Sequence, residues 1–262
     1  MELKNAVCIV TGSAVGIGAA CVIELAKKGC HVVINYTKSE AEAAATAKEC
    51  ENFGIETLLV RANVAEDADC RKMAEQTLKK WGRIDALVNN AGISKFAFDH
   101  SDLNALQSED FQRIYAVNVI GAFQMVRAVA PVMKKQGRGG IVNISSIAGV
   151  MGIGSSVAYA ASKGALNTMT LSLARALAPE IRVNAVCPGF VETRWLKEGL
   201  GEDLYLAAKA GYESGAPLHR VNLPGDVARA AVWFLEGGDL ITGECLIVDS
   251  GYHLGAAPLK AR

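Results

Sequence analysis

Tyr159 and Lys163 are the pair of residues whose types and spacing could do chemistry most directly. Residues four apart on an α-helix lie on one face, one turn apart, so a phenol and an ammonium would be neighbours. A free tyrosine has a pKa of about 10, and a nearby positive charge lowers that pKa by favouring the phenolate. Such a tyrosine exchanges protons near neutral pH. The spacing arises often by chance, and taken alone it favours a half-buried tyrosine beside a solvated lysine.

A glycine-rich segment near the start of the chain has the composition of a phosphate-binding turn. Gly12 permits a tight turn, Gly16 lets backbone approach a pyrophosphate, and Gly18 lets a helix pack close to a sheet. The N-terminus of that helix offers free N–H groups and a partial positive charge to phosphate. The spacing is GxxxGxG, not the commoner GxGxxG, and an ordinary glycine turn is the alternative. The residues expected to contact a dinucleotide here are Gly12, Ser13, Val15, Gly16, Ile17 and Gly18.

Short β-branched runs alternate with helical patterns along the whole chain. Strands are predicted at 6–10, 31–36, 55–61, 84–89, 140–144, 181–186 and 246–248. Helices are predicted at 14–28, from the second strand to about 53, and at 66–81, 108–135, 156–178 and 224–236. This alternation predicts a Rossmann fold, an α/β, doubly wound, seven-stranded parallel sheet with helices on both faces.

No repeat or linker divides the sequence, so one dinucleotide-binding catalytic domain is expected over 1–262. The least regular stretch, about 190–221, has scattered glycines and no clear strand. In α/β sheets, ligands bind beyond the carboxyl ends of the strands. The stretch follows the sixth predicted strand and is therefore predicted to be a substrate lid.

Composition argues against several other classes of protein. The formal net charge is +0, which disfavours binding to nucleic acid or to an anionic membrane. Seven scattered cysteines without a CxxC pair argue against disulfides and a zinc site, and no metal is expected. Neither a signal peptide nor a run of about 20 apolar residues is evident, so a cytoplasmic protein is expected.

Several motifs, in order along 7–252, resemble the single-domain short-chain dehydrogenases/reductases, including the 3-oxoacyl-acyl-carrier-protein reductases. They are the glycine turn in its TGxxxGxG form, the NNAG segment at 89–92, the YxxxK pair, and a proline-glycine pair followed by Thr193. The resemblance implies hydride transfer between NAD(P)(H) and a carbonyl or alcohol carbon. It also implies a homotetramer, built through the helices at 108–135 and 156–178 and through the C-terminal strand region.

The resemblance also assigns catalytic roles. It implies that Tyr159 is the general acid in reduction and the general base in oxidation, with Lys163 lowering its pKa and binding the nicotinamide ribose. Ser146, thirteen residues before Tyr159, would hold the substrate oxygen. Asn118 would hold a water that links Lys163 to solvent. Ser145 is the rival to Ser146, but neighbouring residues leaving a strand point to opposite sides, so it is expected to support the site from behind.

The turn after the second predicted strand bears on the choice of cofactor. An NAD enzyme usually has an acid there for the ribose 2′-hydroxyl, and this chain has Tyr36. Lys38 can pair with a 2′-phosphate, so NADP(H) is expected to be preferred, with NAD(H) left open. Against this, Val15 stands where many NADP-dependent relatives have a basic residue. The remaining residues expected to contact the cofactor are Thr37, Ser39, Asn63, Val64, Asn90, Ala91, Gly92, Tyr159, Lys163, Pro188, Gly189, Val191 and Thr193.

The substrate is expected to be a small, apolar ketone or alcohol. The candidate pocket residues are Ile153, Phe190, Trp195 and Leu196, each of which could equally be core, and 94–102 is placed near the mouth. His100 in that segment has the character of a surface residue.

Three alternatives remain open. A 3-oxoacyl-acyl-carrier-protein reductase ranks lower because Pro131 and Glu180 stand where such enzymes dock an acidic partner on arginines. A nucleotide-sensing protein has no need of Ser146 and Tyr159 together. An epimerase or dehydratase of the extended branch would need a C-terminal domain, and only ten residues follow Tyr252.

Overall fold

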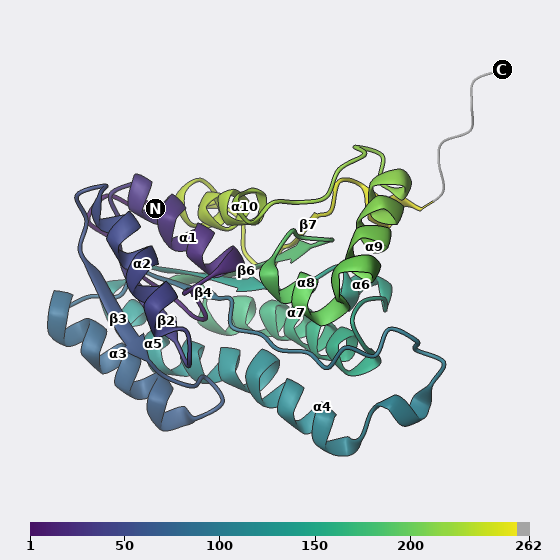
Figure 1. Cartoon of the computed structure of the whole chain (residues 1–262). Helices are drawn as coiled ribbons and strands as arrows, with labels where there is room; N and C mark the ends of the chain where they lie inside the picture. Colours follow the sequence, from purple (N-terminus) through teal and green to yellow (C-terminus); the bar gives the residue numbers. More distant parts are fainter. Residues whose placement is uncertain (256–262) are drawn as a thin grey trace.

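The computed structural model describes residues 1–255 and contains one parallel sheet of seven strands, in the order β3-β2-β1-β4-β5-β6-β7 (Figure 1). The predicted doubly wound α/β architecture is confirmed. Every predicted strand boundary lies within two residues of the one observed. The strands are β1 (Val7–Val10), β2 (His31–Tyr36), β3 (Thr57–Arg61), β4 (Ala86–Asn89), β5 (Gly139–Ile144), β6 (Ile181–Pro188) and β7 (Cys245–Val248).

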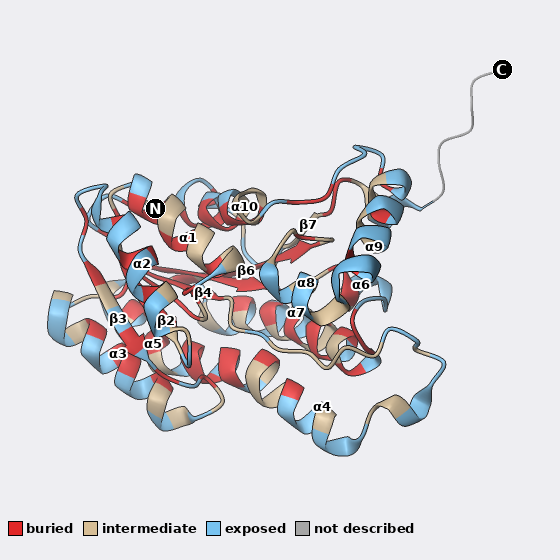
Figure 2. Cartoon of the chain, viewed as in Figure 1, coloured by how far each residue is buried: buried red, intermediate tan, exposed pale blue. Residues whose placement is uncertain are grey.

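Helices cover both faces of the sheet because its central strands are apolar on both sides. In β1, Cys8 and Val10 pack into one buried cluster and Ile9 into the other. Helices α1 (Gly16–Lys27), α2 (Glu40–Glu51) and α10 (Pro224–Glu236) cover the first face. Helices α3 (Asp67–Trp81), α5 (Ala122–Gln136) and α7 (Val157–Leu177) cover the second. Figure 2 shows buried residues concentrated in the sheet and on the helix sides that face it.

The helix predicted over 108–135 is interrupted. Helix α4 (Ser108–Tyr115) passes into a π-helical turn, η2 (Ala116–Gly121), before α5 begins. At the end of this turn, a Cβ on Gly121 would lie 2.8 Å from Val64 Cγ2, so the backbone there packs closely on the loop after β3. π-Helical turns inside α-helices are frequent at functional sites, and this one contains Asn118.

By length and composition, one described helical stretch, Ser108–Gln136, could cross a membrane. Half of the residues in its most apolar 18-residue stretch are buried inside the fold, as in a helix that packs against the sheet.

The segment predicted to be irregular contains two helices, α8 (Arg194–Leu200) and α9 (Glu202–Gly215). The Thr193 hydroxyl caps α8 by accepting from the Leu196 N–H at 3.3 Å. Both ends of the segment lie side by side, since Asn222 N–H donates to Phe190 O and the Glu192 N–H to Asn222 O, each at 2.9 Å. The segment is therefore a long loop that leaves the end of β6 and returns to the same place.

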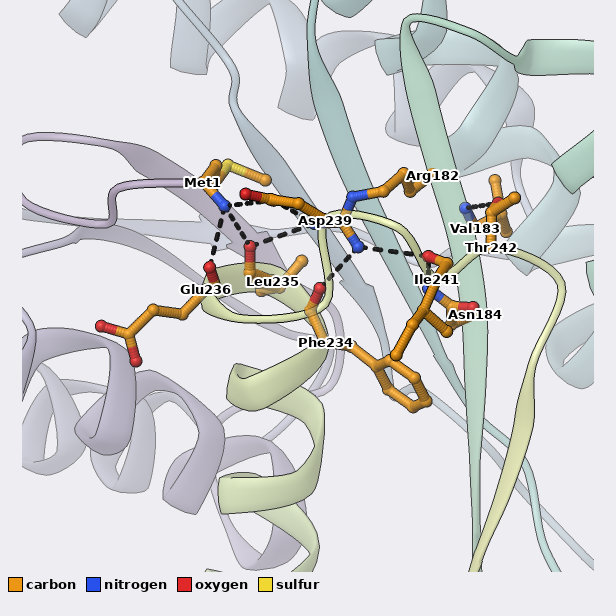
Figure 3. Close-up of polar contacts among 10 residues, drawn as sticks. All are labelled: Met1, Arg182, Val183, Asn184, Phe234, Leu235, Glu236, Asp239, Ile241 and Thr242. Atoms are coloured by element: carbon orange, nitrogen blue, oxygen red, sulfur yellow. Dashed lines mark hydrogen bonds and ion pairs between the residues drawn. The ribbon is translucent and has the colours of Figure 1, made fainter.

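A group of charge-assisted hydrogen bonds fixes α10 to the sheet (Figure 3). Arg182 donates to Phe234 O at 2.7 Å and Leu235 O at 3.2 Å, and the Met1 amine donates to Leu235 O at 2.9 Å. Carbonyls at a helix C-terminus lack intrahelical partners and attract cations. Arg182 is the second residue of β6, so this anchor lies toward the amino ends of the strands.

Candidate active site

One cavity of about 970 Å³ opens at the carboxyl ends of the strands. Gly12 after β1, Asn90 after β4, Ser146 after β5 and Gly189 after β6 all line it. These four strands are consecutive neighbours in the sheet. Residues far apart in the sequence therefore meet at one edge, where α/β folds bind ligands.

The glycine turn forms one wall of this cavity. Gly16 begins α1 with a φ of +63°, and among the atoms of residues 1–255 only Thr193 Cγ2 lies within 4 Å of the position of its missing Cβ, at 3.8 Å. A Cβ on Gly18 would lie 2.4 Å from Gly12 O and 2.5 Å from Asn90 Nδ2. Gly16 leaves open space at the N-terminus of α1, and Gly18 lets the helix pack closely against the turn and Asn90. These features fit the diphosphate of a dinucleotide.

Nearly all of the residues expected to contact a cofactor line this cavity. Ser13 lies beneath the turn, where its hydroxyl donates to Val10 O at 2.7 Å and accepts from the Asn35 N–H at 3.0 Å. Gly18 packs behind the turn, and Lys38 and Ser39 lie beyond the lining. The predicted residues that line the cavity are Gly12, Val15, Gly16, Ile17, Tyr36, Thr37, Asn63, Val64, Asn90, Ala91, Gly92, Tyr159, Lys163, Pro188, Gly189, Val191 and Thr193.

Ser146, Tyr159 and Lys163 meet in the same cavity. Ser146 follows β5, and Tyr159 and Lys163 project from α7. The Lys163 ammonium donates to Ile144 O at 2.8 Å and lies 5.6 Å from the centroid of the Tyr159 ring. Ser145 takes the supporting position expected of it, since its buried hydroxyl donates to Lys163 O at 3.2 Å.

Asn118 does not line the cavity, because its buried side chain bonds to other parts of the protein. Its Oδ1 accepts from the Ile93 N–H at 2.9 Å, and its Nδ2 donates to Ile93 O and Ser162 Oγ, both at 3.0 Å. The side chain thus joins η2 to the segment after β4 and to α7. These hydrogen bonds connect the segments around Lys163, and the water contact expected of Asn118 stays a prediction.

Burial shifts the two titratable groups in opposite directions. It raises the pKa of Tyr159 to about 12, although a hydrogen bond with Ser146 lowers that pKa in part. It also lowers the pKa of Lys163 to about 8. The expected lowering of the Tyr159 pKa by Lys163 is thus not found in the protein alone, because desolvation dominates. At neutral pH the phenol keeps its proton, which suits a proton donor.

The substrate side of the cavity is apolar. Ile153, Phe190, Trp195 and Leu196 all line it, so the predicted pocket residues meet there. Trp195 lies 6.1 Å from the Tyr159 ring, between centroids. His100 lines a separate hollow of about 240 Å³, and its Nε2 lies 3.2 Å from Gly154 O.

Sequence reasoning missed several lining residues. Arg194 on α8 lines the cavity beside the glycine turn and pairs with Glu42 on α2 at 3.3 Å. Asn35 lines it too, and its Oδ1 accepts from the Gly12 N–H at 2.9 Å. Only its adjacency to Thr193 could have indicated Arg194. Also missed were Leu200, Leu204, Ala208, Gly211, Tyr212 and Tyr252.

Comparison with known proteins agrees with this geometry. Residues 12–253 match the family described as enoyl-(acyl carrier protein) reductase. The chain is 39% identical over 248 residues to a Streptomyces violaceoruber protein described as ketoacyl reductase 2 of the granaticin polyketide synthase, covering 95% of this chain and 96% of that one. It is 35% identical over 253 residues to the 3-oxoacyl-[acyl-carrier-protein] reductase of Thermotoga maritima, covering 96% and 99%.

A solved structure supports the same relationship. A Burkholderia xenovorans protein described as a short-chain dehydrogenase/reductase superimposes with a TM-score of 0.89 at 39% identity, covering 96% of this chain and 99% of that one. Fold, site and relatives define an NAD(P)-dependent oxidoreductase that acts on carbonyl or alcohol groups. The chain belongs to the short-chain dehydrogenase/reductase family.

The lowered pKa of Lys163 predicts a pH-dependent contribution to stability. Above about pH 8 the folded protein has lost a proton that the unfolded chain, with an ordinary lysine pKa near 10.4, still binds. The unfolding free energy of the wild type should therefore rise with pH relative to Lys163→Met, by at most about 1.4 kcal/mol per pH unit between pH 8 and 10. Urea denaturation of both proteins without nucleotide measures this difference, and parallel stability curves would contradict the shift.

Proposed function

We propose that this protein is an NADP(H)-preferring reductase or dehydrogenase that interconverts an apolar ketone and its alcohol. The observation that carries the proposal is the meeting of Ser146, Tyr159 and Lys163 in one cavity with the glycine turn. When bound, the nicotinamide supplies or accepts the hydride. The protein supplies binding, orientation and the proton.

In the reduction direction, the Ser146 and Tyr159 hydroxyls hold the substrate oxygen between them. As negative charge develops on that oxygen, Ser146 donates a hydrogen bond and Tyr159 transfers its proton. Lys163, buried beneath the ring, stabilises the resulting phenolate through its ammonium. Trp195 and Phe190 wall the site with apolar rings and reduce the access of water.

The preference for NADP(H) rests on the turn after β2. No acidic side chain lies in 36–39. Lys38 is exposed at the edge of the cofactor side of the cavity, next to the lining residue Thr37. A 2′-phosphate there would gain a cation, whereas a 2′-hydroxyl would lack the usual carboxylate partner.

A 3-oxoacyl-carrier-protein reductase is the second candidate, because two relatives named above carry ketoacyl reductase activity in their descriptions. Electrostatics makes it less favoured. Four basic side chains of the lid and of the segment after β4 are paired within the chain, whereas the exposed Arg220 of the lid is in none of the described ion pairs. The pairs are Arg194–Glu42, Lys197–Glu202, Lys209–Glu192 and Lys95–Asp110. An acidic carrier protein would have to compete for these cations.

We also propose a homotetramer, in the cytoplasm. Ile120, Phe123 and Leu171 are between 42% and 50% exposed on η2, α5 and α7, the helices expected to pair between subunits. Burying such side chains favours association. Light scattering after size exclusion should give four times the chain mass, and a monomeric mass would refute the assembly.

The proton-donor role predicts a specific loss in Tyr159→Phe. The substitution removes one hydroxyl at the reacting oxygen and leaves the ring, so turnover of ketones with NADPH should fall by about 10² to 10⁴-fold. NADPH affinity should stay within about twofold, because this variant keeps the glycine turn and Lys163. Loss of NADPH absorbance measures the rate, and nucleotide fluorescence measures binding. Near-normal turnover would exclude the role.

The cofactor preference predicts that NADPH binds more tightly than NADH and that Lys38→Ala reduces the difference. Loss of one cation at a phosphate should weaken NADPH binding by about tenfold, whereas the NADH dissociation constant should stay unchanged. Lys48→Ala, on α2, is the matched control. Tighter binding of NADH than NADPH by the wild type would overturn the preference.

A further inference from the structure

The cavity extends beyond the reacting groups. Its lining continues from Tyr159 and Phe190 to a set of residues on α9 and after β7. We call this part the distal compartment, and it is lined by Leu204, Ala208, Gly211, Tyr212 and Tyr252. Nothing in the proton transfer described above uses these residues.

Helix α9 is held firmly enough for the compartment to be formed in advance of binding. Phe190 packs against Tyr205 and Tyr212, with ring centroids 5.5 and 5.7 Å away. The buried Tyr212 hydroxyl donates to Asp249 O at 2.7 Å, and its ring stacks on Tyr252 at 4.3 Å. A Cβ on Gly189 would lie 1.9 Å from the Tyr212 oxygen, so the Tyr212 side chain packs closely on the backbone at Gly189.

Gly211 is an exposed residue that lines the compartment without a side chain of its own. It lies inside a 14-residue helix, where glycine costs about 1 kcal/mol relative to alanine. A Cβ there would meet no described atom within 4 Å, although the residue lines the cavity. Gly215, one turn later, differs because its Cβ would lie 3.2 Å from the Tyr252 ring. Packing within the described chain therefore gives no reason for glycine at 211.

The chemistry of the lining limits what could occupy this space. None of the described residues that line the cavity is aspartate, glutamate or histidine. The phenol of Tyr212 is already bonded to Asp249 O and one face of its ring is stacked on Tyr252, so the part of Tyr212 that lines the cavity offers a ligand aromatic carbon. Aromatic faces favour apolar and ring-bearing groups, and a polar chain would lose its hydrogen bonds to water here.

We propose that the distal compartment binds an apolar ring of the substrate, remote from the reacting carbonyl, and that Gly211 sets the largest ring that fits. The substrate class is then a ketone, or the corresponding alcohol, that carries a bulky cyclic or aromatic substituent. This inference rests on the proposed function, since it places the reacting carbonyl at Ser146 and Tyr159.

The test compares cyclohexanone with 4-phenylcyclohexanone, which share the reacting group and differ by one ring. Gly211→Leu fills the compartment, and leucine is a better helix former than glycine, so folding is not expected to suffer. Ala210→Leu adds the same side chain to an exposed position of α9 that does not line the cavity. With NADPH, Gly211→Leu should lower kcat/KM for 4-phenylcyclohexanone by about tenfold or more, the effect of a misfitting group in an apolar pocket.

Cyclohexanone turnover and NADPH affinity should stay within about twofold in Gly211→Leu, and Ala210→Leu should match the wild type. Equal losses for both ketones, or no loss for either, would overturn the compartment while leaving the reductase activity intact.

A binding measurement separates failure of this inference from failure of the proposed function. Titration of 4-phenylcyclohexanone into the NADP⁺ complex, which has no hydride to transfer to a ketone, is followed by tryptophan fluorescence and should show about tenfold weaker binding to Gly211→Leu than to the wild type. If the wild type reduces neither ketone, the proposed function fails for this class, and the titration still decides the compartment. Equal affinity for the two proteins, or no binding to the wild type, would overturn it.

Discussion

All seven strands of the sheet run in the same direction, and the site depends on this constraint. Parallel strands bring their carboxyl ends to one edge, and the order β1-β4-β5-β6 makes neighbours of segments that are far apart in the chain. The glycine turn, the segment 90–92 after β4, Ser146 and the start of the lid therefore share one cavity. Antiparallel pairing would send half of these segments to the opposite edge. The apolar strands that allow burial on both faces are thus what assembles the polar site.

At the carboxyl ends of the strands, hydrogen bonds to backbone carbonyl groups link β5 and α7, which carry the residues proposed to react. Lys163 bonds to Ile144 O at the end of β5, two residues before Ser146, and Ser145 bonds back to Lys163 O. Asn118 ties α7 to the segment after β4 through Ser162 and Ile93. Burial keeps the phenol protonated and weakens the basicity of the amine, so the protein alone favours proton donation. A bound cofactor and substrate would complete the electrostatic environment from the cavity side.

Periodicity and glycine placement were sufficient to predict the sheet, since β-branched runs bounded by turns locate strands well. The motifs also located Ser146, Tyr159 and Lys163 in one site. Three features were beyond sequence reasoning for physical reasons. The π-helical turn at 116–121 keeps a helical composition, so no pattern distinguishes it. The direction of the Tyr159 pKa depends on burial, which the lid partly determines. The Arg194–Glu42 pair joins residues 152 positions apart, and only the folded lid brings them together.

The two ends of the lid lie side by side, and this bears on how the lid could be replaced by protein engineering. The chain leaves the sheet at Phe190 and returns at Asn222, and backbone hydrogen bonds join these two points. An excursion whose ends already touch can be exchanged for another of different length with little change in closure entropy or in the sheet. Residues 190–222 thus form a segment that can be exchanged as a unit. Recombination at its two adjoining ends would transfer one wall of the cavity between relatives while Ser146, Tyr159 and Lys163, which lie outside the exchanged segment, remain in place.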